Sequence, residues 1–305
     1  MKKILSLLLC ILTVTALIST AAYAVTPIDT ARPSSLTLQY SHNGKYFEGL
    51  EIKTYRIAEV FEDGTYALTG DFADYPVKIY DVTSQAEWRI IASTLAAYAE
   101  GDKIAPTREA VTDARGIVEF KDILPGMYLT LSVTATEENT VTVFETFLAV
   151  VPRPSNDGNH NYDVTAFPKC ETHTTGGNIE YKIVKLWKDE GHVEDRPKTV
   201  VIDILKDGVV YKTLNLSASN SWSLTWEAKD DGAVWYAVER ELPVNYTVAS
   251  TREGNTFVIT NSHKSGIPES PQTGDTSVMW PYALVMCLSG GVLVIVATWR
   301  KRREV

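Results

Sequence analysis

The sequence predicts an all-β protein of two tandem β-sandwich domains, the first with one inserted helix, together with an N-terminal signal peptide and a C-terminal transmembrane helix. Three observations support this prediction. Short apolar runs alternate with turn residues over 35–263, and one segment, 84–101, has helical spacing instead. Long apolar stretches stand near both ends of the chain. With 45% hydrophobic and 22% charged residues, the composition is that of a globular protein.

Residues 1–24 have the features of a secretory signal peptide. Two lysines precede an apolar stretch over residues 4–18, and Ala-Tyr-Ala at 22–24 is a small-x-small cleavage pattern. We therefore expect cleavage between Ala24 and Val25 and export of the remaining chain.

The other end of the chain carries a motif, an apolar span and a basic tail, in that order. Residues 276–299 carry no charge and are long enough, at about 1.5 Å per residue, to cross a bilayer as a helix. The tail at 300–305 begins with four basic residues, which favours a cytoplasmic location. A linker at 264–275 precedes the span and contains the motif Ser270, Pro271, Gln272, Thr273 and Gly274.

This three-part arrangement resembles the cell-wall sorting signal of Gram-positive surface proteins, with serine in place of the leucine of LPxTG. The resemblance implies that a sortase cysteine attacks the Thr273 carbonyl, releases the chain from Gly274 onward and passes the acyl group to an amine of the peptidoglycan cross-bridge. The protein would then be covalently anchored to the wall, with its precursor in the membrane. A single-span membrane protein whose linker contains Pro-x-Thr-Gly is the alternative. Ser270 leaves the sortase class open.

Removal of both ends leaves an acidic chain with one cysteine. The sequence has 29 basic and 38 acidic residues; two basic residues precede position 25, and four basic and two acidic residues follow position 273. The exported part, 25–273, therefore carries 23 basic and 36 acidic side chains, which argues against nucleic-acid binding. Only Cys170 remains in it, so an intrachain disulfide is excluded.

A polar, glycine-containing linker at 172–178 separates the two predicted domains. The first domain covers 35–171 after an N-terminal linker at 25–34, and the second covers 179–263. In the first domain, Ser84 and Glu87 form a capping box for the inserted helix, which Gly101 ends. Strands are predicted in the first domain at 35–40, 50–60, 65–68, 116–120, 127–133, 141–151 and 162–167, and in the second at 180–187, 199–205, 209–216, 221–227, 234–239, 245–250 and 256–261.

The first domain resembles the N-terminal domain of Gram-positive pilins. The resemblance rests on EIKTYRIAEV at 51–60, LTGDFADY at 68–75 and YDVTAFPK at 162–169. In that family, the lysine after an aromatic residue and proline is the amine that a pilus sortase joins to the threonine of the next subunit. This implies that Lys169 is the linking nucleophile. A surface lysine that closes the last strand is the alternative.

Three polar residues of the second domain fall on apolar faces of predicted strands. Because side chains alternate between the faces of a strand, Lys185, Glu239 and Asn261 point inward with their apolar neighbours. Those neighbours are Tyr181, Ile183 and Trp187, then Trp235 and Ala237, then Phe257 and Ile259. An unpaired buried charge is costly, so we expect the three polar groups to meet.

These three groups are sufficient to form an amide between side chains. Burial lowers the pKa of a lysine and raises that of a glutamate, so Lys185 can attack the Asn261 carboxamide while Glu239 polarises it and transfers protons. Ammonia leaves, and the bond ties the first strand to the last, as a long-loop disulfide would. A buried salt bridge beside a hydrogen-bonded asparagine, without a covalent link, is the alternative.

The second domain resembles the collagen-adhesin B-type (Cna B) domain. The stretches that carry the resemblance are KLWKDEGHVEDRPKTVVIDILKDG, NSWSLTWEA, WYAVERELPVNYTV and FVITN. The resemblance implies an Ig-like, Cna B-type sandwich in which Lys185, Glu239 and Asn261 make the isopeptide bond. In the first domain, Gln39 stands in the first strand where a lysine is expected, so we predict no such bond there.

The sequence predicts a structural protein and not an enzyme. The five histidines lack metal-binding spacing, and neither a nucleophile elbow nor a phosphate-binding glycine run is present, so we expect no metal and no cofactor. We expect a pilin-like or stalk subunit whose partners are a sortase, the cross-bridge amine and other pilin subunits. The alternative is an adhesin that binds a host matrix protein or a glycan.

Overall fold

The structure is a computed structural model that describes residues 26–264. The predicted signal peptide with its cleavage site, the sorting motif, the transmembrane segment and the basic tail lie outside the described residues. Within residues 26–264, no helix is both long and apolar enough to span a membrane.

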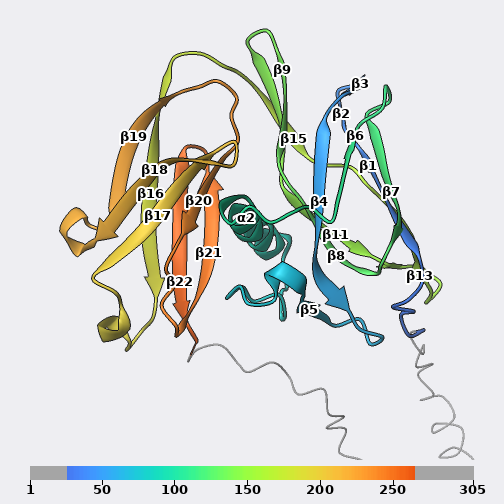
Figure 1. The fold of residues 1–305 in the computed structure, drawn as a ribbon, viewed down its shortest axis with the longest axis horizontal. Helices are drawn as coiled ribbons and strands as arrows, with labels where there is room; N and C mark the ends of the chain where they lie inside the picture. Colours follow the sequence, from blue (N-terminus) through green and yellow to red (C-terminus); the bar gives the residue numbers. More distant parts are fainter. Residues whose placement is uncertain (1–25, 265–305) are drawn as a thin grey trace, which may run out of the picture. The chain divides into compact units, whose positions relative to one another are not determined.

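Strands make up most of the described chain, and one long helix interrupts them, which confirms the predicted β-sandwich class with one inserted helix (Figure 1). The elements of the first region are β1 (Ser34–Gln39), β2 (Ser41–His42), β3 (Lys45–Tyr46), β4 (Glu51–Val60), β5 (Tyr66–Leu68), η1 (Gly70–Phe72), α2 (Gln85–Gly101), β6 (Arg108–Val111), β7 (Ile117–Ile123), β8 (Gly126–Thr130), β9 (Val133–Glu137), β10 (Thr140–Phe144), β11 (Phe147–Val151), β12 (Arg153–Pro154), β13 (His160–Asn161), β14 (Asp163–Ala166) and β15 (Cys170–Thr174).

The first region forms three main sheets around an apolar core. Their strand orders are β14-β1-β7, β15-β10-β9 and β11-β8-β4-β5, with β6 paired to β4. Along β1, buried residues alternate with half-buried ones, as the period of a strand requires. The largest buried side chains of this core include Leu36, Leu38, Tyr40, Tyr128 and Phe144.

Helix α2 starts and ends where the sequence predicts. The Ser84 hydroxyl accepts a hydrogen bond from the Glu87 backbone N–H, and the Glu87 carboxylate accepts one from the Ser84 N–H, which completes the capping box. Its buried residues are mostly alanines and other small or aliphatic side chains, and they contact β20 and β21 of the second region as well as β8 and β11. The helix therefore joins the cores of the two regions.

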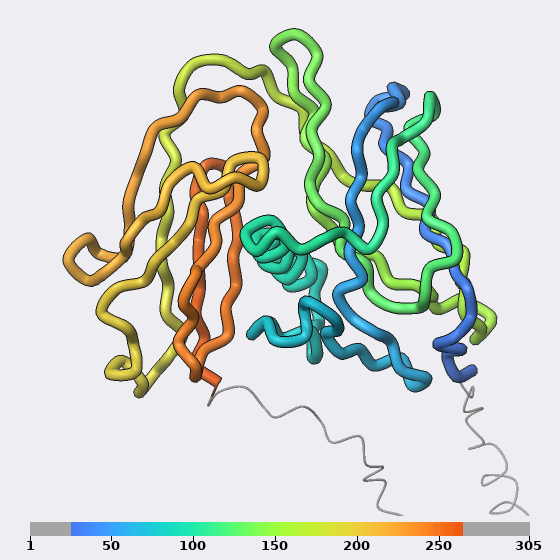
Figure 2. Tube along the Cα trace, viewed as in Figure 1, coloured from blue at the N-terminus to red at the C-terminus, as the bar shows by residue number. Residues whose placement is uncertain are grey.

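The chain passes from the first region to the second through a segment that Figure 2 traces in yellow-green, and the first part of this segment is strand. Residues 172–174, at the start of the predicted linker, belong to β15 and pair with β10. Residues 175–177 then lead into the next strand, which begins at Asn178. Thr172 of β15 lies opposite Thr142 of β10, and their hydroxyl oxygens are hydrogen-bonded at 3.1 Å. This cross-strand contact stabilises the part of β15 that extends into the predicted linker.

The second region is a two-sheet sandwich of seven strands and two short 3₁₀ turns. Its elements are β16 (Asn178–Lys188), η2 (Val193–Asp195), β17 (Thr199–Lys206), β18 (Val209–Ser217), η3 (Ala218–Asn220), β19 (Ser223–Lys229), β20 (Trp235–Glu239), β21 (Tyr246–Glu253) and β22 (Thr256–His263). One sheet has the order β19-β16-β22-β21 and the other β18-β17-β20. The predicted turn between β17 and β18 places Asp207 and Gly208 at positive φ, as a tight hairpin requires.

In this sandwich the first strand lies beside the last. Strands β16 and β22 pair in parallel, with Lys185 opposite Ile259 and Trp187 opposite Asn261. The side chain of Asn261 is therefore close in register to that of Lys185. This pairing brings the two ends of the sandwich together in the middle of one sheet.

Candidate functional site

The candidate site lies between the two sheets of the second sandwich. Lys185 comes from β16 and Asn261 from β22, which are neighbours in one sheet, and Glu239 ends β20 of the facing sheet. The period-two alternation of β16 and β22 turns Lys185 and Asn261 toward the interior. The three residues are only 2%, 1% and 0% exposed, in the order Lys185, Glu239 and Asn261.

The Glu239 carboxylate connects the other two groups. Asn261 Nδ2 donates a hydrogen bond to Glu239 Oε1 at 2.9 Å. Lys185 Nζ lies 3.4 Å from Glu239 Oε2, an ion-pair distance, and neither side chain has any exposed surface. The structure thus places the predicted amine, acid and carboxamide together in the core.

Strand β20 holds Glu239 inside because both of its faces are covered. All five of its residues are buried, which differs from the alternating pattern of a surface strand. On the side away from the sandwich interior, Tyr236 reaches Thr146 with 3.3 Å between the hydroxyl oxygens, and α2 packs along the strand. The Tyr98 hydroxyl of α2 also donates to the Glu239 backbone carbonyl at 3.3 Å. The first region therefore helps to exclude water from the site.

Burial changes the proton affinity of the two titratable groups in opposite directions. Desolvation lowers the pKa of Lys185 from 10.5 to about 8, although the nearby Glu239 charge opposes the change. Desolvation likewise raises the pKa of Glu239, against the opposing effects of Lys185 and Asn261. Both shifts favour the neutral amine and the neutral acid over the ion pair.

This arrangement leaves two buried oxygen atoms without a hydrogen bond. In the described structure, Asn261 Oδ1 has no hydrogen-bond partner, and Glu239 Oε2 has only the longer ion-pair contact. A buried polar atom without a partner costs about 1–3 kcal/mol. The three groups therefore pack together without forming a complete hydrogen-bond network.

The arrangement is suited to amide condensation. In such a condensation a proton would pass from the Lys185 ammonium to the Glu239 carboxylate, and the neutral Nζ would attack Cγ of Asn261. The Asn261 C–N bond would then break, with Glu239 transferring a proton from the attacking nitrogen to the leaving amino group. The products would be one Lys185–Asn261 amide and one ammonia, and the reaction would consume no oxidant or cofactor.

The equivalent strands of the first region carry different side chains. Strand β1 pairs in parallel with β14, as β16 does with β22. The buried positions there are Leu36, Leu38 and Val164, while Gln39 is half-buried. These residues provide no amine for a bond of the kind expected in the second sandwich.

Lys169 lies on the surface, between β14 and β15. Its side chain is exposed, the preceding Pro168 is buried, and its backbone carbonyl accepts a hydrogen bond from the Glu145 N–H at 2.9 Å. The backbone at this position is therefore fixed while the amine is open to solvent. Ser270, Pro271, Gln272, Thr273 and Gly274 lie outside the described residues, as do Ala24 and Val25.

Sequence reasoning did not identify a second buried polar group near this site. Asp189 is 4% exposed and accepts two hydrogen bonds from the Arg196 guanidinium, at 2.5 and 2.6 Å. It also accepts one from the Tyr246 hydroxyl at 3.0 Å. The hydrogen bonds from Arg196 lower the pKa of Asp189, which favours its charged form. Asp189 follows β16 directly, but its partners lie 7 and 57 positions away, so local spacing gives no signal.

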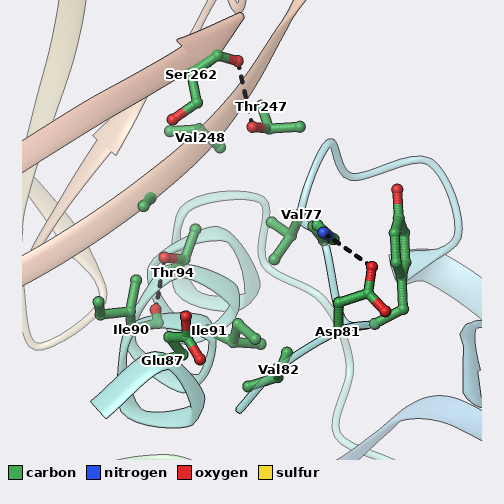
Figure 3. A pocket seen from close by; sticks show the side chains of 13 residues that line it. Val77, Asp81, Val82, Glu87, Ile90, Ile91, Thr94, Thr247, Val248 and Ser262 are labelled. Atoms are coloured by element: carbon green, nitrogen blue, oxygen red, sulfur yellow. Dashed lines mark hydrogen bonds and ion pairs between the residues drawn. The ribbon is translucent and has the colours of Figure 1, made fainter. Parts of the chain in front are cut away.

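A pocket of about 270 Å³ lies where α2 meets the second sandwich (Figure 3). Ile90, Ile91 and Thr94 line it from the helix, and Thr247 and Val248 line it from β21. Its polar wall includes Asp81, which is paired with Lys78 at 3.4 Å. The pocket marks the edge of the contact between the two regions.

Comparison with known proteins gives one family match, and it covers the second sandwich. Residues 181–262 match the model of the Cna protein B-type domain. The matched segment includes all three residues of the candidate site. None of the curated proteins matches the chain significantly in sequence.

Several solved structures are similar to the chain at low identity. A single B repeat unit of the collagen-binding surface protein Cna of Staphylococcus aureus is 14% identical, with 76% of this chain and 98% of that chain covered and a TM-score of 0.27. The major pilin SpaD of Corynebacterium diphtheriae is 17% identical over 77% of this chain and 65% of that chain, with a TM-score of 0.31. The shaft pilin SpaA of Lactobacillus rhamnosus GG is 14% identical over 76% and 98%, with a TM-score of 0.28.

Proposed function

We propose that this chain, whose residues 181–262 match the Cna protein B-type domain, is a structural subunit of a bacterial cell surface and not an enzyme. The observation that carries the proposal is the joint burial of Lys185, Glu239 and Asn261 between the two sheets of the second sandwich. Because no external substrate reaches groups with no exposed side-chain surface, their chemistry acts on the protein itself.

In this proposal, Lys185 and Asn261 form an intramolecular isopeptide bond with Glu239 as the proton-transfer group. The bond joins β16 to β22, the strands at the two ends of the sandwich. Tension applied between those ends then passes through a covalent link instead of through hydrogen bonds between strands. The second sandwich, residues 178–263, contains no cysteine, so the bond gives it the stabilisation that a disulfide gives to other exported domains.

The two ends of the chain supply the remaining parts of the proposal. A sortase joins Thr273 to a cross-bridge amine of the cell wall, after the signal peptide has directed export. Lys169 is the amine that receives the threonine of a neighbouring subunit, so that the protein is built into a pilus-like polymer. The exposed position of Lys169 on a fixed backbone is consistent with this role.

The experiment that tests the proposed role is fractionation of a Gram-positive host that carries sortases and expresses the full chain. We expect the protein in the covalent wall fraction, as a ladder of high-mass species on denaturing gels. The Lys169→Ala variant should lose the ladder and keep the wall-bound monomer, whereas Thr273→Ala should lose both. Lys121→Ala, which removes another exposed lysine of the first region, is the matched control and should keep the ladder.

The outcomes separate the parts of the proposal. A ladder that persists in Lys169→Ala would exclude this residue as the linking amine. Wall attachment that persists in Thr273→Ala would exclude the proposed anchoring reaction. Wild-type protein that is extracted by detergent alone would indicate the single-span membrane protein instead.

A further inference from the structure

Two histidines and an aspartate of the second sandwich meet at one end of β22. His192 lies in the loop after β16, Asp195 is in the 3₁₀ turn η2, and His263 is the last residue of β22. One potential ligand atom from each lies within 4.8 Å of the others. Because His263 is about 70 positions from the other two, no sequence spacing could reveal the group.

The two imidazole rings are arranged around one carboxylate oxygen. His192 Nδ1 lies 3.3 Å from Asp195 Oδ2, and His263 Nε2 lies 3.4 Å from the same oxygen. The rings are stacked, with 3.7 Å between their centroids and planes 8° apart. The lone pairs of the ring nitrogens lie in the ring planes, so the two stacked rings can share one ion only when one of them rotates about its Cβ–Cγ bond. His192 is the ring with room to rotate, because its side chain is 35% exposed whereas that of His263 is 10% exposed.

The two nitrogen–oxygen distances match two edges of a tetrahedral zinc site. Zn–N and Zn–O bonds of about 2.0–2.1 Å at tetrahedral angles place neighbouring ligand atoms about 3.3–3.4 Å apart. Two imidazoles and one carboxylate are also a ligand set that zinc uses when a fourth position is open to water.

The surroundings fix the ligands and leave a route for the ion. The His263 side chain is 10% exposed, and the Tyr246 ring packs edge-on against it with 5.1 Å between centroids. The side chains of His192 and Asp195 are 35% and 40% exposed, so the open side of the group faces solvent. The nearby Arg196 is bound by Asp189 through two hydrogen bonds, which offsets its repulsion of a cation.

We propose that His192, Asp195 and His263 bind one Zn²⁺ ion, with water in the fourth position. The ion would link the loop between β16 and β17 to the end of β22, two residues beyond Asn261. This contact is independent of the Lys185–Asn261 bond, because it uses none of the same side chains. Its effect is to hold the end of the last strand, at the point where the described chain leads toward the predicted wall linker.

The test is a metal titration of the untagged full chain, since a histidine tag would itself bind zinc. Calorimetry should give one Zn²⁺ per chain, and Co²⁺ should give the visible absorption of a tetrahedral site that Zn²⁺ removes. Mg²⁺, which prefers oxygen ligands and octahedral geometry, should not compete. Saturating Zn²⁺ should raise the melting temperature, because the ion binds only the folded arrangement.

The variants His192→Ala, Asp195→Asn and His263→Ala should each weaken Zn²⁺ binding at least tenfold. His173→Ala is the matched control, because His173 is also paired with an aspartate, Asp230, at 3.6 Å, but no third ligand joins that pair among the described residues. Circular dichroism establishes that each variant is folded, and Asp195→Asn changes a partly exposed side chain with little change of shape.

Three results would overturn the proposal. The first is wild-type protein with no saturable Zn²⁺ binding, which needs no variant to interpret. The second is Co²⁺ bound without a tetrahedral spectrum. The third is binding that the three site variants leave unchanged, or that His173→Ala weakens as much as they do.

Discussion

Lys185 lies in a buried position that disfavours its charged form. Its ammonium group lies 3.4 Å from both the Glu239 carboxylate and the Leu186 carbonyl, and 4.3 Å from the centroid of the Trp187 ring. A cation over an aromatic face gains about 0.5–2 kcal/mol, which is less than the several kcal/mol that burying an ion costs. Burial therefore brings the neutral amine, which is the nucleophile in the proposed reaction, within reach near neutral pH, although the Glu239 charge opposes the change.

This lowered pKa makes a pH prediction for a variant that cannot react. In Asn261→Ala, Lys185 stays a free amine with a pKa of about 8 when folded and 10.5 when unfolded. The unfolded chain then binds more protons between these values, so stability rises with pH across this window. Lys185 contributes about 3 kcal/mol to this rise in the free energy of unfolding once the pH has passed both of its pKa values.

The measurement is chemical denaturation of Asn261→Ala and of Lys185→Met/Asn261→Ala at pH 8 and pH 10.5. Other lysines and tyrosines titrate in both proteins, so the difference between the two reports Lys185 together with its effect on the pKa of Glu239. The double variant should be the more stable at pH 8, and its advantage should shrink toward pH 10.5. A difference that does not change with pH would mean that Lys185 is not desolvated in the fold.

At the scale of residues, the sequence predicts which face of its strand each of these side chains occupies, but not which side chains contact one another. The parity of β16, β20 and β22 predicts that Lys185, Glu239 and Asn261 point inward, because successive side chains of a strand point to opposite faces and each of the three shares a face with apolar neighbours. Their distances depend on how two sheets pack, which no single strand determines. The His192, Asp195 and His263 group was missed altogether, since it forms only when a loop folds back onto the last strand.

At the scale of elements, α2 contributes to the second sandwich as much as to the first. The Thr94 hydroxyl accepts a hydrogen bond from the Ser250 backbone N–H of β21 at 2.8 Å and donates one to the Ile90 carbonyl at 2.7 Å. Thr94 is 0% exposed, so water cannot replace either partner. One side chain therefore links the helix to β21.

Thr94→Val should destabilise the folded chain by about 1–3 kcal/mol, because it leaves the buried Ser250 N–H without an acceptor while it preserves the shape of the side chain. Thr94→Ser keeps the hydroxyl and should restore most of the loss. Melting temperatures of the three proteins measure the effect. Equal melting temperatures for Thr94→Val and the wild type would show that the contact between α2 and β21 contributes nothing.

The strands and the helix could largely be predicted from the sequence, but the elements that each of them packs against could not. The strands of the second sandwich follow from alternation and from the Asp207-Gly208 turn, and the start of α2 follows from its capping box, all of which are local signals. The covering of both faces of β20 is not local. It arises because the alanine-rich face of α2 packs on the second sandwich, and a helix pattern alone does not specify which sheet it meets.

At the scale of the whole molecule, the proposed cross-link closes a loop that contains nearly all of the second sandwich. Lys185 and Asn261 are separated by about 75 positions, and a covalent link over such a loop stabilises a fold by roughly 4–5 kcal/mol in the chain-entropy model. Asn261→Ala should therefore unfold at a clearly lower denaturant concentration than the wild type. Equal midpoints would argue against any covalent constraint on this domain.

The intact mass of the purified full chain, compared with the sequence of the processed protein, tests the proposed bond most directly. Formation of the Lys185–Asn261 amide releases one ammonia, so we expect the wild type to be lighter than its sequence by that mass. Glu239→Ala lacks the proton-transfer group and should have the full mass of its own sequence, as should Asn261→Ala. A wild-type protein at full sequence mass would contradict the bond and leave Lys185, Glu239 and Asn261 as a buried, noncovalent polar cluster.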